Sequence, residues 1–279
     1  MNFPKFWARG QSKGFSVWRW SDRNFGEAKS EAQAAAERLA AQFAAHELPD
    51  QRYGYGNRPM REPVLREMRD AAGQLAHAIT RNSYGCQVLN SAVALFVDVD
   101  LPEQKPKAAG LFGSLFGRKG PEPEDPAKPA MGQAAAWAQA HRGWNWRIYR
   151  TRGGLRLLAT HALFDTSDPV CEQVFAALGA DPLYRKLCQT QKCFRARLTP
   201  KHWRCQPAVG HPPARWPFES AAEEKAFTDW DAKYRAACQA KATCQLLDAG
   251  PGPVHPELRE VVALHDGITR ALSPGFELA

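Results

Sequence analysis

The sequence has no apolar run long enough to cross a lipid bilayer, which needs about 20 consecutive apolar residues. Its longest such run covers only residues 92–97. The first residues, MNFPKFWARGQSKG, carry basic side chains but lack the apolar stretch of a secretory signal. These absences argue against a membrane-spanning or secreted chain, and we expect a cytoplasmic protein.

The sequence also lacks a CxxC pair, and its seven cysteines are an odd number. A disulfide framework is therefore not expected, and buried reduced thiols are the first interpretation. The nearest approach to a zinc-ligand spacing is at Cys188, Cys193 and Cys205. A fourth ligand would have to come from His202, His211 or a more distant cysteine. Structural zinc stays open as the alternative.

Basic residues are concentrated in one part of the chain. The net charge is +8 over 279 residues, yet the segment from Arg142 to Arg215 alone holds thirteen Lys and Arg against four Asp and Glu. The remainder of the chain is therefore close to neutral. A basic segment inside a near-neutral protein favours a polyanionic partner, either nucleic acid or nucleotide phosphate. A solvated, arginine-rich surface is the alternative interpretation.

The order of predicted elements favours a mixed α+β fold with a central mixed or antiparallel sheet, flanked by N-terminal and C-terminal helices. Residues 1–80 are expected to form an N-terminal strand–helix region. Residues 81–215 hold most predicted strands and form the core, and residues 102–130, rich in Pro, Gly, Lys and Ala, are expected to be an exposed insertion. Residues 216–279 are expected to be helical.

Local patterns place individual elements within these regions. Apolar periodicity predicts helices over residues 27–46 and about 62–79. Ser220, with Glu223 three residues later, forms a capping-box signature that predicts a helix running towards Leu247. Residues 144–161 read as a hairpin around Gly153-Gly154, where glycine can take the positive φ of a tight turn.

Two carboxylates stand at the end of a predicted buried strand, in ALFVDVDLP. Residues i and i+2 of a strand share a face, so Asp98 and Asp100 are expected to project together while Val97 and Val99 face the core. Side-by-side carboxylates repel unless a positive charge lies between them. Oxygen ligands of this kind suit a hard divalent cation, Mg²⁺ or Mn²⁺. Pairing with an arginine is the alternative.

Two basic groups follow. The hairpin brings Arg150, Arg152 and Arg156 around its glycine turn, where they could contact phosphate or simply form an exposed charged face. In the alternating strand FRARLTPK, Arg195 and Arg197 share one face, a spacing that suits successive phosphates. The candidate phosphate ligands beyond this strand are Lys201 and Arg204.

Taken in order, these segments resemble the catalytic core of archaeo-eukaryotic-type primases and primase-polymerases. The resemblance covers roughly residues 85–205. FVDVD corresponds to the first motif of that family, whose two aspartates bind metal. TRGGLR corresponds to the second, with Arg156 in the position of a nucleotide-contacting histidine. An aspartate of the third motif corresponds to Asp181 or, less well, Asp165, and RARLTPK is similar to the basic segment that follows.

The resemblance implies an RRM-like core and a metal-dependent nucleotidyltransferase acting on nucleic acid and nucleoside triphosphates. Asp98, Asp100 and Asp181 would hold Mg²⁺ or Mn²⁺. A non-catalytic nucleic-acid-binding protein and a metal-dependent nuclease remain alternatives that use the same residues. His161, at the end of the hairpin, is expected to be a structural hydrogen-bond partner, and Arg81 and Tyr84 are placed beside the same cleft.

Overall fold

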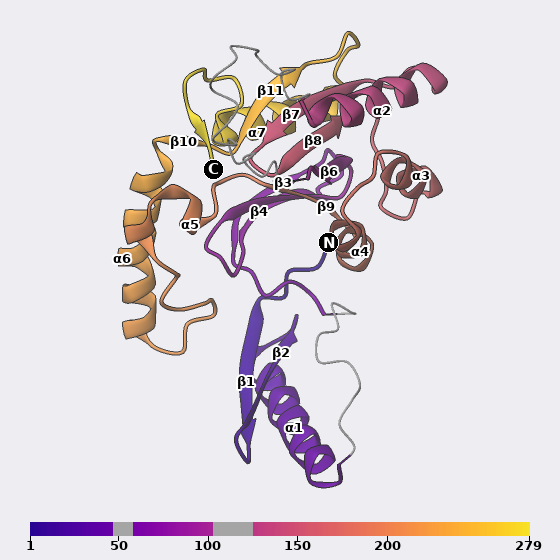
Figure 1. Ribbon diagram of the computed structural model, residues 1–279. Helices are drawn as coiled ribbons and strands as arrows, with labels where there is room; N and C mark the ends of the chain where they lie inside the picture. Colours follow the sequence, from indigo (N-terminus) through magenta and orange to yellow (C-terminus); the bar gives the residue numbers. More distant parts are fainter. Residues whose placement is uncertain (47–57, 103–124) are drawn as a thin grey trace, which may run out of the picture.

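The computed structural model describes residues 1–46, 58–102 and 125–279. Over these residues the fold is mixed α+β, with seven α-helices and several sheets, of which the two largest are four-stranded and antiparallel (Figure 1). No helix of the described part is long and apolar enough to span a membrane. Most of the predicted insertion, including LFGSLFG, lies outside the described residues.

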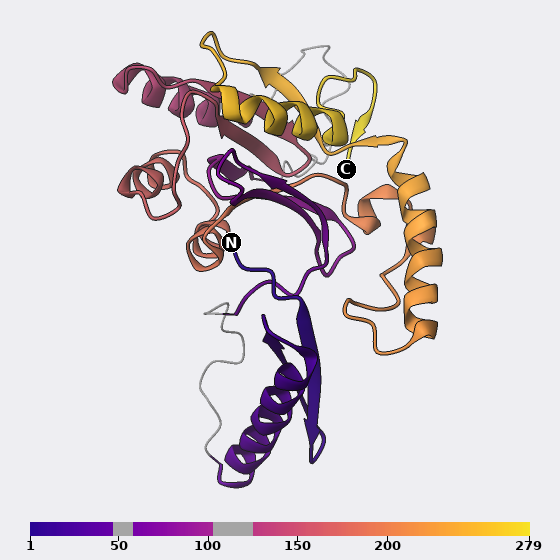
Figure 2. The same cartoon turned by 180° about the vertical axis from the view of Figure 1, so that it is seen from behind.

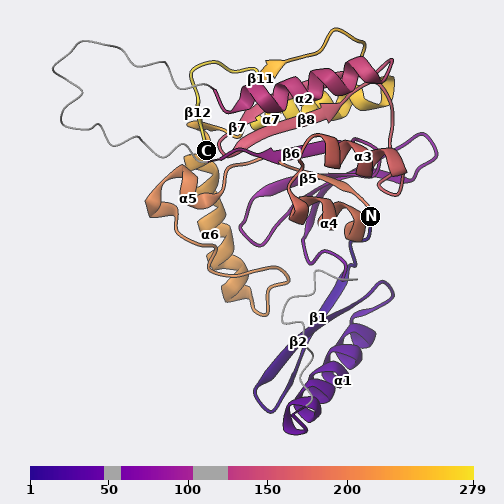
Figure 3. The same cartoon turned by 45° about the vertical axis from the view of Figure 1, so that its right-hand side comes forward.

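An N-terminal unit consists of a hairpin, β1 (Phe6–Ser12) and β2 (Phe15–Ser21), packed against α1 (Phe25–Ala44). Alanines along one face of α1 allow this close packing. A Cβ on Gly10 of β1 would lie only 2.1 Å from the carbonyl oxygen of Ala32, so glycine is required there. The unit extends away from the rest of the molecule (Figures 1 and 3).

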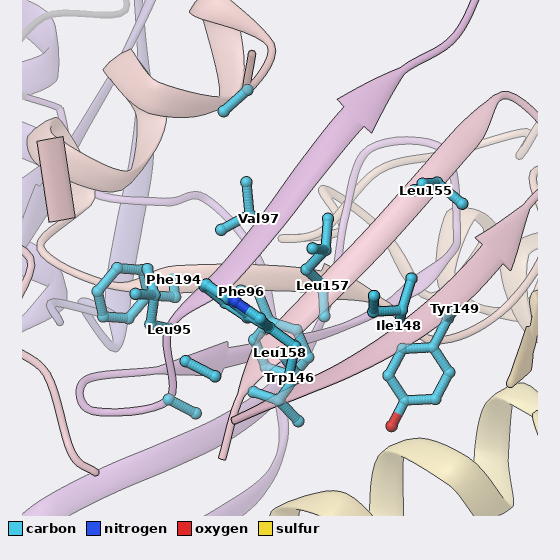
Figure 4. Close-up of a cluster of buried hydrophobic side chains, with 14 of the residues drawn as sticks. Leu95, Phe96, Val97, Trp146, Ile148, Tyr149, Leu155, Leu157, Leu158 and Phe194 are labelled. Atoms are coloured by element: carbon cyan, nitrogen blue, oxygen red, sulfur yellow. The ribbon is translucent and has the colours of Figure 1, made fainter. Parts of the chain in front are cut away.

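The first large sheet has the order β11-β7-β8-β6 and is antiparallel throughout. Its strands are β6 (Phe96–Asp100), β7 (Trp146–Thr151), β8 (Gly154–Ala159) and β11 (Cys244–Asp248). We call it the β6 sheet. Its buried side chains, such as those labelled on β6, β7 and β8 in Figure 4, form the main hydrophobic core.

Helices cover both faces of the β6 sheet. α2 (Ala127–Ala140) packs against β7 and β8. On the opposite face, α7 (Arg259–Thr269) places His265 with its ring 5.5 Å from that of Phe96 and 4.6 Å from that of Tyr149. Figure 2 shows α7 lying across this face. β8 is therefore buried along its whole length, whereas the edge strand β11 is exposed at its end.

The second large sheet, the β5 sheet, has the order β3-β4-β5-β9. Its strands are β3 (Val64–Arg69), β4 (Leu75–Arg81), β5 (Gln87–Ser91) and β9 (Phe194–Arg197). The predicted boundary at residue 80 falls within β4. β9 comes from the end of the core sequence, pairs with β5, and lies beside β6 (Figure 1).

The helix predicted over residues 62–79 is wrong, because that segment forms β3 and β4. Asp70 breaks the pattern, since its carboxylate accepts hydrogen bonds from the backbone N–H groups of Ala72 and Gln74 at 2.9 and 2.8 Å. Gly73 completes the turn with φ of +75°. The apolar residues that matched a helical spacing lie instead on two paired strands, an ambiguity that periodicity cannot resolve over such lengths.

Two short helices connect β8 to β9. α3 (Pro169–Ala177) and α4 (Pro182–Gln191) both start with proline after an aspartate cap, Asp168 and Asp181 respectively. The carboxylate of Asp181 accepts a hydrogen bond from the N–H of Tyr184 at 2.7 Å. This cap fixes the first turn of α4 directly beside β6.

The C-terminal region combines helices with short strands. Ser220 caps α6 (Ala221–Cys238), which confirms the predicted start, but the helix ends before Leu247. Residues 244–248 instead become β11, an edge strand that pairs with β7. The remaining elements are α5 (His202–Cys205), β10 (Lys241–Ala242) and β12 (Glu277–Leu278), together with short 3-10 turns at Pro207–Val209 and Pro256–Leu258.

The hairpin of β7 and β8 is present as predicted, but its glycines act differently from the expectation. Neither Gly153 nor Gly154 has a positive φ. Gly154 is required because its backbone lies directly against β6, where an added Cβ would be 1.9 Å from the carbonyl oxygen of Val99. An added Cβ on Gly153 would meet nothing within 4 Å.

We therefore expect Gly154→Ala to reduce the free energy of unfolding by about 1–3 kcal/mol, because the side chain forces β8 away from β6. Gly153→Ala is the matched control and should change it by less than about 0.5 kcal/mol. Urea denaturation of both variants measures the difference. Equal stability of the two variants would contradict the close approach at Gly154.

Candidate functional site

A pocket of about 280 Å³ lies at the carboxyl end of β6. Its walls come from the end of β6, the β7–β8 hairpin, the first turns of α4, and the segment joining β9 to α5. The charged residues that line it are Asp98, Asp100, Arg156, Asp181, Arg197, Lys201 and Arg204. The structure thus brings together all three predicted aspartates and four of the seven predicted basic residues.

Asp98 and Arg156 form a bidentate ion pair across adjacent strands. The two residues are directly opposed in the β6–β8 ladder. Arg156 donates from Nε to Oδ1 of Asp98 at 2.8 Å and from Nη2 to Oδ2 at 3.1 Å. The Arg156 side chain is only 2% exposed, whereas that of Asp98 is 33% exposed at the pocket wall. Parallel hydrogen bonds of this type are among the strongest that side chains make.

The third nitrogen of Arg156 reaches other elements. Nη1 donates to the backbone carbonyl of Arg197 at 2.8 Å and lies 3.5 Å from Nε2 of His265. Burial alone would lower the pKa of Arg156, but the carboxylate of Asp98 more than offsets that effect and the pKa stands above its usual value. Arg156 is therefore a permanent cation that joins β6, β8, β9 and α7.

Asp100 and Asp181 are the acids that the Arg156 side chain does not contact. The backbone N–H of Asp181 donates to the carbonyl of Asp98 at 3.1 Å, which holds the start of α4 against β6. Burial and the nearby carboxylates of Asp181 and Asp98 raise the pKa of Asp100. This corner of the pocket thus concentrates negative charge.

Arg197, Lys201 and Arg204 form the basic part of the pocket lining, which we call the basic wall. No ion pair within the described residues involves Arg197, Lys201 or Arg204. Burial and the neighbouring Arg197 and Arg204 guanidinium groups lower the pKa of Lys201, and burial and Arg197 likewise lower that of Arg204. These cations repel one another, so an anion bound between them would relieve the repulsion.

The other predicted basic residues do not line the pocket. Arg195 pairs with Glu62 at 2.8 Å and is largely buried, so the predicted two-arginine comb of β9 is divided between an internal ion pair and the pocket. Arg150 pairs with Asp125 at 2.6 Å. Arg152 is half exposed at the hairpin turn, and its guanidinium lies 3.9 Å from the carboxylate of Glu277.

Several further candidates lie elsewhere. Asp165 does not line the pocket, and its carboxylate accepts hydrogen bonds from Ser167, so Asp181 is the third acid of the site. The ring of His161 accepts from the backbone of Asn145 at 3.3 Å. Arg81 is buried and pairs with Asp231 at 2.6 Å, so it is structural.

Sequence reasoning missed two aromatic contributions to this region. The hydroxyl of Tyr184, one turn into α4, donates to the carbonyl of Phe96 at 2.8 Å and helps fix α4. Trp203 is 47% exposed, lies 5.2 Å from the Lys201 ammonium, and packs edge-on against the 44% exposed Tyr84 at 5.3 Å. An aromatic residue between two basic ones, in KHWR, was the available signal.

The residues fit a divalent cation only in part. Asp98 is engaged by Arg156, so a three-carboxylate cage does not fit. Within the described ranges, no group of three or more His, Cys, Asp or Glu side chains could by itself hold a metal ion. Asp100 and Asp181 remain, and Mg²⁺ is commonly held by one or two carboxylates together with substrate phosphates. That smaller donor set fits the pocket.

Among the described residues, the cysteines do not gather into the metal-ligand group that the zinc alternative requires. All seven are free thiols. The sulfur of Cys205 lies 3.6 Å from that of Cys238 on α6, a partner that the spacing of Cys188, Cys193 and Cys205 did not indicate. His202 is buried against His211, with ring centroids 4.4 Å apart.

The chain matches no protein-family model, and comparison with curated proteins and with solved structures finds no similar one. The geometry of the pocket therefore carries the functional argument.

Neutralising the two aspartates of β6 should change the stability of the protein in opposite directions. Asp98→Asn leaves Arg156 as an unpaired buried cation and should reduce the free energy of unfolding by about 3 kcal/mol. Asp100→Asn removes a repelled carboxylate and should raise the melting temperature at pH 7.

The pH dependence of the melting temperature tests whether ionisation of Asp100 causes the gain in stability of Asp100→Asn. Folding raises the pKa of Asp100, so ionisation of this carboxyl costs more free energy in the folded state than in the unfolded state. The resulting loss of stability is complete once the pH exceeds the pKa of the folded state. The gain from Asp100→Asn should therefore shrink as the pH falls towards the unfolded value of about 3.9. Thermal unfolding of both variants between acid and neutral pH measures this. A gain that persisted unchanged in acid would contradict it.

Proposed function

We propose that this pocket binds a nucleoside triphosphate and a nucleic-acid end and catalyses metal-dependent nucleotidyl transfer of the primase or polymerase type. The observation that carries the proposal is that two acids, Asp100 and Asp181, line the same pocket as three cations that form no ion pair within the described residues. A triphosphate with its divalent ion presents both charges at once, so it complements both walls.

The basic wall binds phosphate in this proposal. Arg197 and Arg204 offer planar guanidinium groups that can each hold two phosphate oxygens, and Lys201 adds a point charge between them. Their mutual repulsion makes them a poor structural cluster and a good anion site. Without an anion this wall lacks any compensating carboxylate within ion-pair distance among the residues described.

The acidic corner would hold the metal. Mg²⁺ or Mn²⁺ bound at Asp100 and Asp181 would neutralise charge on the triphosphate and act as a Lewis acid. Asp181 is positioned for this by the cap of α4, which uses one of its carboxylate oxygens, while the other accepts no hydrogen bond from the described residues. Asp98 sets the orientation of the β6 end through Arg156.

The order of elements supports a primase-like core. β6, α2, β7, β8, the α3–α4 pair and β9 follow one another as β-α-β-β-α-β. In the β6 sheet, β8 lies between β6 and β7, as in the RRM-like arrangement. The last strand of this order, β9, pairs with β5 in the second sheet, and Arg156 binds it through the carbonyl of Arg197.

A single-stranded substrate would explain the exposed aromatic pair. Trp203 lies beside the ammonium of Lys201 in the basic wall, precedes Arg204 in the chain, and packs against Tyr84. Exposed rings beside cations form the stacking platforms on which single-stranded nucleic acids bind, at about 1–3 kcal/mol per stacked base.

The test is incorporation of labelled NTPs or dNTPs on primed and unprimed single-stranded templates with Mg²⁺ or Mn²⁺. We expect wild-type protein to extend strands and Asp100→Asn or Asp181→Asn to lose at least about 100-fold in rate, because the metal site is lost. Arg204→Gln should weaken triphosphate binding about tenfold, as expected for a lost charged hydrogen bond. Arg142→Gln, an exposed arginine outside the pocket, is the matched control.

Other outcomes identify the alternatives. Release of nucleotides from a labelled strand, lost in the same aspartate variants, would indicate a nuclease. Salt-sensitive strand binding that needs no divalent ion and is unaffected by Asp100→Asn, without incorporation, would indicate a non-catalytic nucleic-acid-binding protein.

A further inference from the structure

A second pocket, of about 270 Å³, lies between the β4–β5 turn, the start of α6 and the loop that precedes it. None of its residues lines the first pocket. The side chains that matter for its chemistry are Arg61, Arg215, Trp216, Phe218, Glu224 and Phe227. We call it the Arg215 pocket. Its size suits one ring system with one attached group.

One side of the Arg215 pocket is aromatic. The rings of Phe218 and Phe227 lie 5.2 Å apart, and Phe227 in turn lies 5.5 Å from Trp230, which supports it from inside. Trp216 also lines the cavity and is half-buried. A planar ligand could therefore contact ring faces and edges that are already held in place by packing.

The other side carries two cations without ion-pair partners. Arg61 is held in position by stacking on Trp18, 4.4 Å from the ring centroid. Burial and the nearby guanidinium of Arg215 lower the pKa of Arg61. Neither arginine forms an ion pair with any carboxylate of the described residues, although Glu219 lies close enough to Arg61 to favour its charged form.

The neighbouring charges are already compensated. Arg81, which also lines the cavity, is paired with Asp231, and Glu219 is paired with Arg9 at 2.9 Å. Glu224, exposed at the rim, is the one carboxylate among the residues that line the pocket. The pocket therefore has an excess of positive charge next to an aromatic wall.

We propose that the Arg215 pocket binds a nucleotide unit, with its base against Phe218, Phe227 and Trp216 and its phosphate between Arg61 and Arg215. A phosphate suits this site better than a carboxylate, because two guanidinium groups can each donate to a different pair of its oxygens. This site is separate from the transfer chemistry of the first pocket and does not use its acids or a metal.

The position of the Arg215 pocket suggests how the two sites communicate. Ser83 and Gly85 line the Arg215 pocket, and Tyr84 between them packs on Trp203. In the sequence, Trp203 lies between Lys201 and Arg204, two basic residues that line the first pocket. The nucleotide unit could therefore belong to a bound strand or be a free mononucleotide, and the two sources share the same chemistry.

The experiment is calorimetric titration of the full chain in EDTA with AMP, adenosine and inorganic phosphate. We expect AMP to bind at least about tenfold more tightly than either fragment, since each fragment loses one half of the contacts. Arg215→Gln and Trp216→Leu should each weaken AMP binding about tenfold or more. Arg142→Gln, outside both pockets, should leave it unchanged.

Specific results would overturn the proposal. These are no AMP binding by a folded wild-type protein, adenosine binding as tight as AMP binding, or full affinity in Arg215→Gln. Loss of AMP binding in Lys201→Gln but not in Arg215→Gln would move the ligand to the first pocket. Circular dichroism confirms that each variant is folded, and Arg215 is exposed enough that its substitution should be tolerated.

A (dA)10 oligonucleotide distinguishes the sources in the same assay. If it displaces AMP from wild-type protein and binds more weakly to Arg215→Gln, the unit belongs to a bound strand. If AMP binding depends on Arg215 and the oligonucleotide does not displace it, the ligand is a free mononucleotide. Because no metal or triphosphate is present, failure of strand extension leaves this result unaffected.

Discussion

The ion pair between Asp98 and Arg156 is the interaction on which the site depends. A guanidinium that is 2% exposed must have all of its nitrogens satisfied, and here Asp98, the carbonyl of Arg197 and the ring of His265 surround it. These partners come from β6, β9 and α7, so one buried charge fixes the relative position of both large sheets and a covering helix. The pocket forms where these elements meet.

A second buried network supports the same region. The carboxylate of Asp266 accepts hydrogen bonds from Tyr149 at 2.7 Å and from Arg147 at 2.5 Å, and lies 3.3 Å from Nδ1 of His265. Burial raises the pKa of Tyr149, so its hydroxyl remains protonated and donates to the carboxylate. Arg156 and Asp266 therefore flank His265 with opposite charges. Through Arg156, which lines the pocket, this network supports the end of β6.

Sequence patterns predicted the parts of the fold that depend on neighbouring residues. The β7–β8 hairpin, the Ser220 cap and the shared face of Asp98 and Asp100 follow from local spacing, and the structure contains them. β3 and β4 were missed because their apolar spacing also fits a helix, although they pair locally across the turn at Asp70 and Gly73. β11 was missed because its strand state depends on pairing with β7, far along the chain. For the same reason, alternation on β9 could not indicate that Arg195 would pair with Glu62 while Arg197 lines the pocket.

Arg156 also contributes to the net charge of the first pocket. Its three aspartates face Arg156, Arg197, Lys201 and Arg204, so the formal charges nearly cancel and leave one net positive charge. A nearly balanced cavity has little long-range attraction for an isolated ion of either sign. A metal ion and the phosphates that accompany it would enter together as a weakly charged complex, and few counterions would be released. Association at this pocket should therefore depend only weakly on ionic strength.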